Sequence, residues 1–361
     1  MYVKKIKLKN FRNYTEREFE FSNGVNIFYG DNGQGKTNVL EALFLSSIGK
    51  SFRTNKDIEM IKDGCDSYEV TVFTDAAAEN EIKITYNKNK KKTISISGIY
   101  LTKMGDLMGI LPGVIFSPQN MSLLSQGPGE RRKFMDMAIS QLKPVYYFNL
   151  QQYNKIINQK NAFLKEINPK NADYTLLDIW NEQLSKYGAK IVEARKEYFE
   201  KLTPLVSDFH SYISGGKEKV KIKYIYSCDS DKAVFYEKLE KEKTHEVERH
   251  MSLVGPQRDD IDVILEGTGD IKKYGSQGQQ RTLVIAMKLS ELTVLRDVTG
   301  KTPVLLLDDV LSELDDTRQK LLLGKITDSQ VFITCTNPEN IQNTSPAGEK
   351  SFFIKEENIV F

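Results

Sequence analysis

One eight-residue segment has the composition and spacing of a phosphate-binding loop, G-x-x-x-x-G-K-[ST]. Glycines let its backbone curl so that successive N–H groups face phosphate oxygens, and the N-terminus of a following helix adds positive charge. We expect Lys36 to contact the terminal phosphates of ATP and Thr37 to offer its hydroxyl to Mg²⁺. A strand pattern at 25–29 and a helical pattern at 36–48 flank the segment, as this chemistry requires. The predicted loop consists of Gly30, Asp31, Asn32, Gly33, Gln34, Gly35, Lys36 and Thr37.

Two carboxylates, Asp308 and Asp309, follow the apolar run 304–307. A strand that is apolar on both faces is typical of the centre of a parallel sheet, and such sheets bind ligands at the carboxyl ends of their strands. We expect Asp308 to hold the magnesium ion and Asp309 to orient or deprotonate the attacking water. The structural alternative is that the pair caps the residues that follow.

A second segment suited to anions, with the sequence YGSQGQQR, occupies residues 274–281 and precedes a helical pattern. One nucleotide does not need two phosphate cradles from the same chain. The segment resembles the signature motif of the ABC-type ATPases, in which one subunit's signature closes over ATP held by the other's phosphate loop. The resemblance implies that Ser276, Gly278 and Gln279 contact the nucleotide of a partner. Residues 312–315 similarly resemble the D-loop of that superfamily.

Five motifs occur in order along the chain, at 9–14, 30–42, 255–260, 276–282 and 305–315. By these motifs and their order, the chain resembles the RecF family over essentially its whole length. The resemblance implies an α/β fold, an ABC-type P-loop ATPase head with a mixed sheet lobe and an inserted, mainly helical lobe. It also implies ATP-dependent homodimers and binding to DNA, single-stranded or as gapped duplex. The mediators RecO and RecR would be partners in loading a recombinase, in support of replication recovery and SOS induction.

Two positions depart from the ABC-type pattern. Many members carry glutamate after the magnesium aspartate, whereas Asp309 is one methylene shorter, which is consistent with a slow ATPase. The histidine that usually follows the next strand has no counterpart, and Thr334 or Thr336 can form hydrogen bonds there but cannot titrate.

Three further polar residues are candidates for nucleotide contact. Arg12 and Asn13 lie one strand before the phosphate loop, where a structural turn is the competing interpretation. Gln119 follows the strand ending at Ser117 and is our candidate for the glutamine that links the two lobes, with an ordinary surface glutamine as the alternative.

The elements that must position these residues fall into two lobes. Alternating strand patterns dominate the first third of the chain, long helical patterns follow, and strand patterns return at 260–266. We therefore predict a discontinuous ATPase sheet lobe, 1–117 with 251–361, and a helical lobe, 118–250. Pro204 is expected to break a helix within the second lobe.

Composition indicates a globular protein. The chain has 361 residues, of which 40% are hydrophobic and 28% charged, enough for two packed lobes. No apolar run approaches the roughly 18 residues of a membrane-spanning helix, and the N-terminal residues alternate in polarity, so we expect no membrane segment, no secretory signal and a cytoplasmic location. The three cysteines are widely separated, which indicates reduced thiols and no zinc site.

The net charge is only +2, so any affinity for DNA must come from local basic clusters. For each single cluster a solvated surface is the alternative. The clusters are Lys4, Lys5, Lys7, Lys9 and Arg12; Lys88, Lys90, Lys91 and Lys92; Arg131, Arg132 and Lys133; and Lys217, Lys219, Lys221 and Lys223.

Two other functions compete with a DNA-binding ATPase. The ATP-binding subunit of an ABC transporter shares the signature, but transporter domains place it much closer to the phosphate loop than the span from Thr37 to Ser276. A small-molecule P-loop kinase would not need a signature motif.

Overall fold

The computed structural model describes residues 1–361 except 76–80, 122, 169–173, 327, 339–348 and 356–361. The chain forms two compact units. We call Met1–Ser122 with Lys288–Phe361 the sheet unit, and Leu123–Met287 the helical unit. None of the helices in the described ranges is long and apolar enough to cross a membrane.

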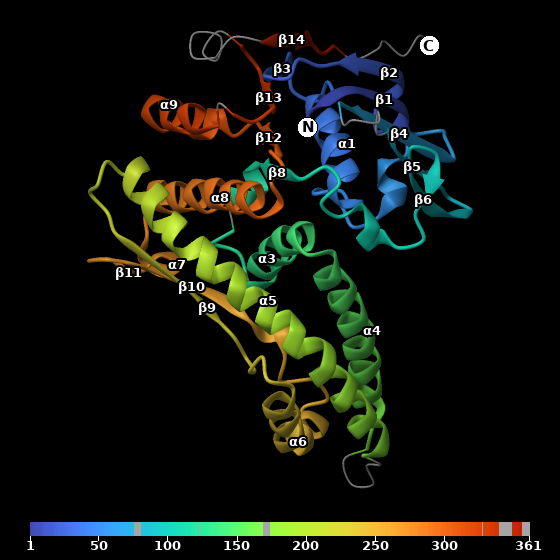
Figure 1. The fold of residues 1–361 in the computed structure, drawn as a ribbon, viewed down its shortest axis with the longest axis vertical. Helices are drawn as coiled ribbons and strands as arrows, with labels where there is room; N and C mark the ends of the chain where they lie inside the picture. Colours follow the sequence, from blue (N-terminus) through green and yellow to red (C-terminus); the bar gives the residue numbers. More distant parts are fainter. Residues whose placement is uncertain (76–80, 122, 169–173, 327, 339–348, 356–361) are drawn as a thin grey trace. The chain divides into compact units, whose positions relative to one another are not determined.

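The sheet unit contains an antiparallel sheet of strand order β2-β1-β4-β5-β6-β7. Buried and exposed residues alternate along β1, with Ile6 and Leu8 in the core, because one face of the sheet is covered and the other is solvated. Strands β5 and β6 lie side by side (Figure 1), and Lys88 is in the turn that connects them. The strands are β1 (Val3–Phe11), β2 (Tyr14–Glu20), β4 (Ser67–Thr74), β5 (Glu81–Asn87), β6 (Lys90–Ile96) and β7 (Ile99–Tyr100).

The second sheet of this unit is parallel and has the order β14-β3-β13-β12-β8. Its register places Leu307 opposite both Phe116 and Ile333, and Cys335 opposite Tyr29, so the carboxyl ends of four strands share one edge. The strands β3, β12 and β8 are fully or almost fully buried, as expected for central parallel strands. The strands are β3 (Val25–Tyr29), β8 (Gly113–Phe116), β12 (Val304–Asp308), β13 (Val331–Cys335) and β14 (Lys350–Phe353).

Helix α1 (Lys36–Ile48) packs against strands of both sheets, including β4, β8 and β12, and forms the core between them. It is buried on nearly all sides, in keeping with its almost uniformly apolar sequence. The unit also contains η1 (Asp57–Met60), η2 (Met104–Leu107), α2 (Pro118–Met121), η5 (Leu311–Glu313) and α9 (Asp316–Lys325).

In the helical unit, the long helices α4 and α5 lie side by side, and α6 packs on α5 (Figure 1). Pro204 does not end α5, contrary to our expectation, because Leu202 and Val206 bury the helix face around it and this packing offsets the lost backbone hydrogen bond. The helices are α3 (Pro128–Leu142), α4 (Pro144–Glu166), α5 (Thr175–Ile213), α6 (Lys232–Glu248), η4 (Pro256–Arg258) and α7 (Ile271–Tyr274), together with the start of α8 (Gln277–Thr299).

The helical unit also has its own three-stranded antiparallel sheet, β11-β10-β9, against which α5 packs. The sequence analysis placed the 260–266 strand in the sheet lobe, but β10 pairs with β9, matching Val263 with Ile222. The units therefore divide near 122 and 287, whereas our predicted helical lobe ended at 250. The strands are β9 (Val220–Ile225), β10 (Asp260–Leu265) and β11 (Gly269–Asp270).

Candidate functional site

The phosphate loop joins β3 to α1 in the backbone conformation that its glycines permit. Gly30 has a φ of 139°, and a Cβ there would lie 2.4 Å from the carbonyl oxygen of Ile354, so a side chain is excluded. Gly35, with a φ of 107°, occupies the N-cap of α1, and no side chain caps the helix there. The first turn of α1 also lacks acidic residues, which leaves its N–H groups suited to an anion.

Lys36 is held over this loop. Only 4% of its surface is exposed, and Nζ donates to the carbonyl oxygens of Gly30 at 2.6 Å and Asp31 at 2.9 Å. The ammonium group therefore lies at the mouth of the loop, where a phosphate bound by the backbone N–H groups would meet it.

The phosphate loop and the acidic strand end meet directly. Thr37 Oγ1 donates to Asp308 Oδ1 at 2.7 Å, which joins segments 271 residues apart in the chain. Thr334 Oγ1 donates to the same oxygen at 3.0 Å and accepts the backbone N–H of Asp309 at 2.8 Å. Burial raises the pKa of Asp308, and the hydrogen bonds from Thr37 and Thr334 act in the opposite direction. The hydroxyl of Thr334 thus joins the side chain of Asp308 to the backbone of Asp309.

Asp309 has a different setting from its neighbour. It is partly exposed and has a φ of 52°, a left-handed conformation that aspartate tolerates better than most residues. This backbone turns the chain sharply after β12, so the two consecutive carboxylates need not share one environment. A partly exposed carboxylate beside a buried one is compatible with separate roles toward water and metal.

The donor set fits magnesium. Thr37 Oγ1 and Asp308 Oδ1 are hard oxygen atoms beside the loop, and Mg²⁺ is usually held by one or two such groups together with phosphates and water. Among the described residues, no group of three or more His, Cys, Asp or Glu side chains is arranged to hold a metal ion. Thr37 and Asp308 would hold the ion, which would supply positive charge to the phosphates.

Arg12 and Asn13 lie beside the phosphate loop. Asn13 Nδ2 donates to the carbonyl of Gln34 at 2.9 Å, and a Cβ on Gly35 would lie 2.5 Å from that amide nitrogen. Arg12 forms a two-pronged ion pair with Glu41 of α1, with N···O distances of 2.6 and 2.8 Å. Both residues therefore support the loop and its helix, and direct contact with nucleotide stays a prediction.

Sequence reasoning gave no role to Glu41 or Arg53. Glu41 is fully buried and accepts from Ser51 Oγ as well as from the guanidinium groups of Arg12 and Arg53. Arg53 also donates to Asn38 Oδ1 at 2.8 Å in the first turns of α1. A single carboxylate within an apolar helical pattern was the available signal, because buried acids require a cationic partner.

Gln119 is exposed and follows β8, whose end is aligned with that of β12. It therefore belongs to the same sheet edge as Asp308. Whether its side chain contacts nucleotide stays a prediction.

The signature segment forms a helix N-terminus in the helical unit. The N–H of Gln279 donates to Ser276 Oγ at 3.2 Å, and the N–H of Ser276 donates to Gln279 Oε1 at 2.9 Å, which is a capping box. Gly278 lies in the first turn, and its carbonyl accepts from Thr282 Oγ1 at 2.9 Å. Ser276 is exposed, so its hydroxyl is accessible to another molecule.

Comparison with known proteins identifies the family. The chain matches the family described as RecF/RecN/SMC N terminal domain over residues 2–357. It is 42% identical to the DNA replication and repair protein RecF of Ruminiclostridium cellulolyticum, with 99% of each chain covered. It is 41% identical to the protein of the same name from Lachnospira eligens, covering 100% of this chain and 99% of that one.

Comparison with solved structures supports the same family. The "recombination mediator protein RecF-ATP in RecFOR pathway" is 38% identical and matches with a TM-score of 0.89, covering 99% of this chain and 96% of that chain. A second such structure, with "RecF-ATPrS", matches with a TM-score of 0.90 at 38% identity over 98% of this chain and 96% of that chain. An Smc head domain from Pyrococcus furiosus, 15% identical with a TM-score of 0.56 over 98% of this chain and 94% of that chain, shares the fold. The chain belongs to the RecF family of ABC-type ATPases.

Proposed function

We propose that this protein is an ATP-dependent DNA-binding switch of recombinational gap repair. The observation that carries the proposal is the hydrogen bond between Thr37 and Asp308, because it brings the phosphate loop and the acidic strand end into one site. Relatives named for DNA replication and repair, and a similar structure named with ATP, support the same role. The phosphate loop would bind ATP, and Thr37 with Asp308 would hold Mg²⁺.

ATP hydrolysis would be slow and coupled to DNA. Lys36 would stabilise the charge on the transferred phosphate, and Asp309 would orient or deprotonate the attacking water. Thr334 donates to Asp308 and accepts from the backbone of Asp309, so it can position both acids but cannot accept a proton at neutral pH. Water activation would then depend on Asp309, whose side chain is one methylene shorter than the glutamate of many ABC-type ATPases, which favours a timed switch over rapid turnover.

ATP would act by joining two copies of the chain. A nucleotide shifts an equilibrium only through contacts that one state makes and the other lacks. The exposed Ser276 hydroxyl supplies such a contact, since it would meet the γ-phosphate held by the phosphate loop of the partner. Gly278 and Gln279, in the first turn of α8, would lie beside the same γ-phosphate and contact the nucleotide.

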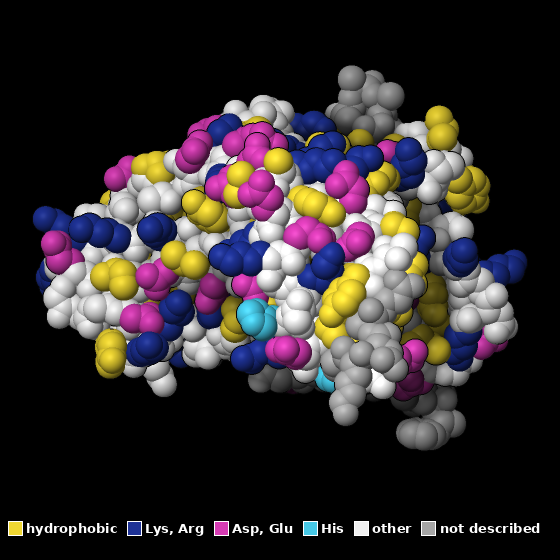
Figure 2. Space-filling view, turned by 90° about the horizontal axis from the view of Figure 1, so that it is seen from below, with side chains coloured by type: hydrophobic (Ala, Val, Ile, Leu, Met, Phe, Trp, Pro, Cys, Tyr) yellow, Lys and Arg dark blue, Asp and Glu magenta, His cyan; other side chains and the backbone are white. Residues whose placement is uncertain are grey.

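The basic clusters differ in how far acidic groups already neutralise them. Lys5 and Lys7 share Glu18, while Lys88 and Lys92 pair with aspartates. On the face shown in Figure 2, Lys and Arg side chains are interspersed with Asp and Glu. Pairing therefore distinguishes the clusters better than the number of basic residues does. In the third cluster, Arg131 pairs with Asp260 and Lys133 pairs with Glu130. The guanidinium group of Arg132 donates to the carbonyl oxygen of Asp259.

The fourth cluster is the strongest candidate for DNA contact. Lys219, Lys221 and Lys223 are exposed and form no ion pair with any residue in the described ranges. Alternation along β9 puts Lys221 and Lys223 on one face of the strand, about 7 Å apart, and Lys219 directly precedes the strand. Asp262 lies opposite Lys223 but already pairs with Lys272 at 3.6 Å.

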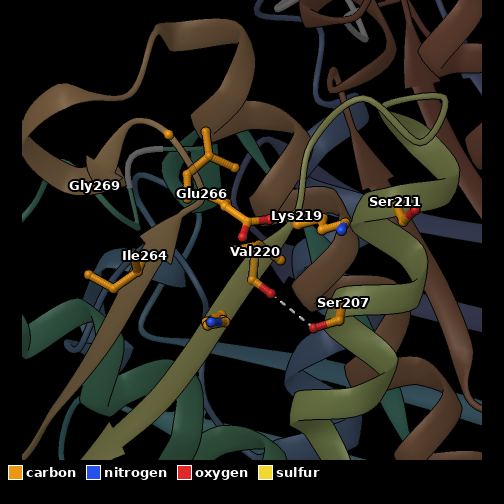
Figure 3. A pocket seen from close by; sticks show the side chains of 10 residues that line it. Ser207, Ser211, Lys219, Val220, Ile264, Glu266 and Gly269 are labelled. Atoms are coloured by element: carbon orange, nitrogen blue, oxygen red, sulfur yellow. Dashed lines mark hydrogen bonds between the residues drawn. The ribbon is translucent and has the colours of Figure 1, made fainter.

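A cavity of about 720 Å³ borders this row of lysines. Lys219 and the hydroxyl-bearing Ser207 and Ser211 of α5 lie along it (Figure 3). Ser207 donates to the carbonyl of Val220 at 3.1 Å and so fixes α5 against β9. Lysine and hydroxyl side chains can bind the sugar–phosphate backbone of DNA, and such contacts do not depend on the base sequence.

The mediators RecO and RecR would be partners in loading a recombinase, in keeping with a similar structure assigned to the RecFOR pathway. We place this activity in the cytoplasm, where bacterial DNA lies, with roles in replication recovery and SOS induction. No observation favours the transporter subunit or the kinase over this proposal, and the family match supports neither.

Sedimentation of the purified protein tests the proposal. We expect a monomer without nucleotide, a dimer with ATP and Mg²⁺, and a larger complex when gapped duplex DNA is added. A sedimentation coefficient that ATP does not change, at protein concentrations well above those in the cell, would contradict the switch.

A further inference from the structure

The signature motif is tied to the turn between α5 and β9 by one carboxylate. Gln279 Nε2 donates to Glu218 Oε1 at 2.8 Å, across 61 residues of the chain. Glu218 follows the turn at Gly215 and Gly216 and lies two residues before the start of β9. Its side chain is only 25% exposed, so the hydrogen bond is partly shielded from water.

This contact fixes which way the carboxamide of Gln279 points. An ionised carboxylate can only accept hydrogen bonds, so Glu218 selects the NH₂ end of the amide. The oxygen end must then face the helix start, where it accepts the N–H of Ser276 at 2.9 Å. Without Glu218 the amide of Gln279 could rotate by half a turn, and its NH₂ group would then face the backbone N–H of Ser276, which is also a donor.

The consequence reaches the hydroxyl of Ser276. Because Ser276 Oγ accepts the N–H of Gln279, a lone pair is engaged in the cap while the hydroxyl proton is left to donate outward. An outward donor at an exposed helix N-terminus is the group that a phosphate oxygen would meet. Glu218 thus sets the direction of the Ser276 donor through Gln279.

Glu218 lies beside a buried histidine and between two exposed lysines. His210 is fully buried, with Nε2 3.6 Å from Glu218 Oε2, and burial lowers the pKa of this histidine, so it is neutral at pH 7. Lys217 and Lys219 flank Glu218 in sequence and are exposed. The carboxylate is therefore available as a strong acceptor for Gln279.

We propose that Glu218 is a positioning residue of the signature motif, which orients Gln279 and Ser276 for the nucleotide of a partner. This inference rests on the proposed function, since it assumes that the signature meets the γ-phosphate of the partner. It adds a residue from the α5–β9 turn, far from the signature in sequence, to the machinery of ATP-driven dimerisation.

The test compares Glu218→Ala with Glu218→Gln by sedimentation over a range of ATP concentrations. Loss of a hydrogen bond to a charged group predicts roughly tenfold weaker dimerisation for Glu218→Ala. Glu218→Gln retains an oxygen acceptor and should recover most of this, to within about threefold of the wild type. Glu266→Ala is the matched control and should dimerise normally, because this exposed carboxylate, in the turn between β10 and β11 (Figure 3), has no hydrogen bond or ion pair to the described residues of the signature.

A double-mutant comparison separates positioning from general destabilisation. Gln279→Met removes the amide, so adding Glu218→Ala to it should cause no further loss. ATP binding by the monomer and the midpoint of thermal unfolding should stay unchanged in each variant that is compared. Normal dimerisation of Glu218→Ala, or an equal additional loss in the Gln279→Met background, would overturn the inference. If Ser276→Arg also dimerised normally, the proposed function itself would fall, which distinguishes the two failures.

Discussion

The phosphate-loop region and the signature region are both suited to anions, but they differ in how complete they are. Around the loop, Lys36, Thr37 and Asp308 are buried or joined by hydrogen bonds between distant segments. At the signature, Ser276 and Gln279 complete each other's backbone hydrogen bonds at an exposed helix start. The first region contains within one chain the groups that we propose hold a nucleotide, whereas the second presents a donor and a helix N-terminus without a metal-binding acid.

Because the two regions differ in this way, we expect that substitutions can affect nucleotide binding and nucleotide-driven association separately. Changes in the first region should abolish ATP binding by the monomer, or hydrolysis in the ATP-bound dimer. Changes in the second should leave ATP binding by the monomer intact and affect association, together with the hydrolysis that depends on it.

Lys36→Ala should have the largest effect. The substitution removes a buried ammonium group and its hydrogen bonds at the loop, so ATP affinity should fall about 100-fold or more. Titration of the monomer with a fluorescent ATP analogue measures this. Unchanged affinity would show that the loop does not bind phosphate.

Asp309→Asn should separate hydrolysis from binding. The Asn side chain keeps the size of Asp309 but cannot take a proton, so turnover should fall about 100-fold while ATP affinity stays within about twofold. Thr37 and Asp308 are unchanged, so the ATP-bound dimer should persist longer. Single-turnover hydrolysis and dimer lifetime are the measurements. Failure of this variant to dimerise would instead make Asp309 structural or a metal ligand.

Neutralising two lysines of β9 should weaken DNA binding without affecting ATP. Lys221→Gln with Lys223→Gln should lower affinity for gapped duplex about tenfold at low salt and reduce the salt dependence by about two counterions. The control changes Lys90 and Lys91 of β6 to Gln, two exposed lysines of the sheet unit. An equal loss of DNA affinity in the control would show that binding depends on the overall positive charge and not on the lysines of β9.

Much of this arrangement could be predicted from sequence, because local patterns determine it. The loop glycines, the strand 304–307 and the serine before α8 carry their conformations in their own residue types. Strand pairing was harder, since β10 has the pattern of any half-buried strand and only tertiary packing decides that its partner is β9.

Two further misses have the same physical origin. Pro204 lies inside α5 because burial of neighbouring side chains outweighs its local preference. The bond between Glu218 and Gln279 spans two elements whose sequences contain no common signal. Side-chain contacts between distant segments depend on the packed structure, so they cannot be read from composition or periodicity.

Ser276→Arg tests the central claim most directly. The substitution places a bulky cation where the γ-phosphate held by a partner would approach, in a residue that is exposed and outside the phosphate loop. In sedimentation experiments with saturating ATP and Mg²⁺, we expect this variant to remain monomeric while its monomer affinity for ATP stays within about twofold of the wild type. ATP-driven dimerisation and hydrolysis at wild-type levels would show that the signature does not face the nucleotide of a partner, and would contradict the account.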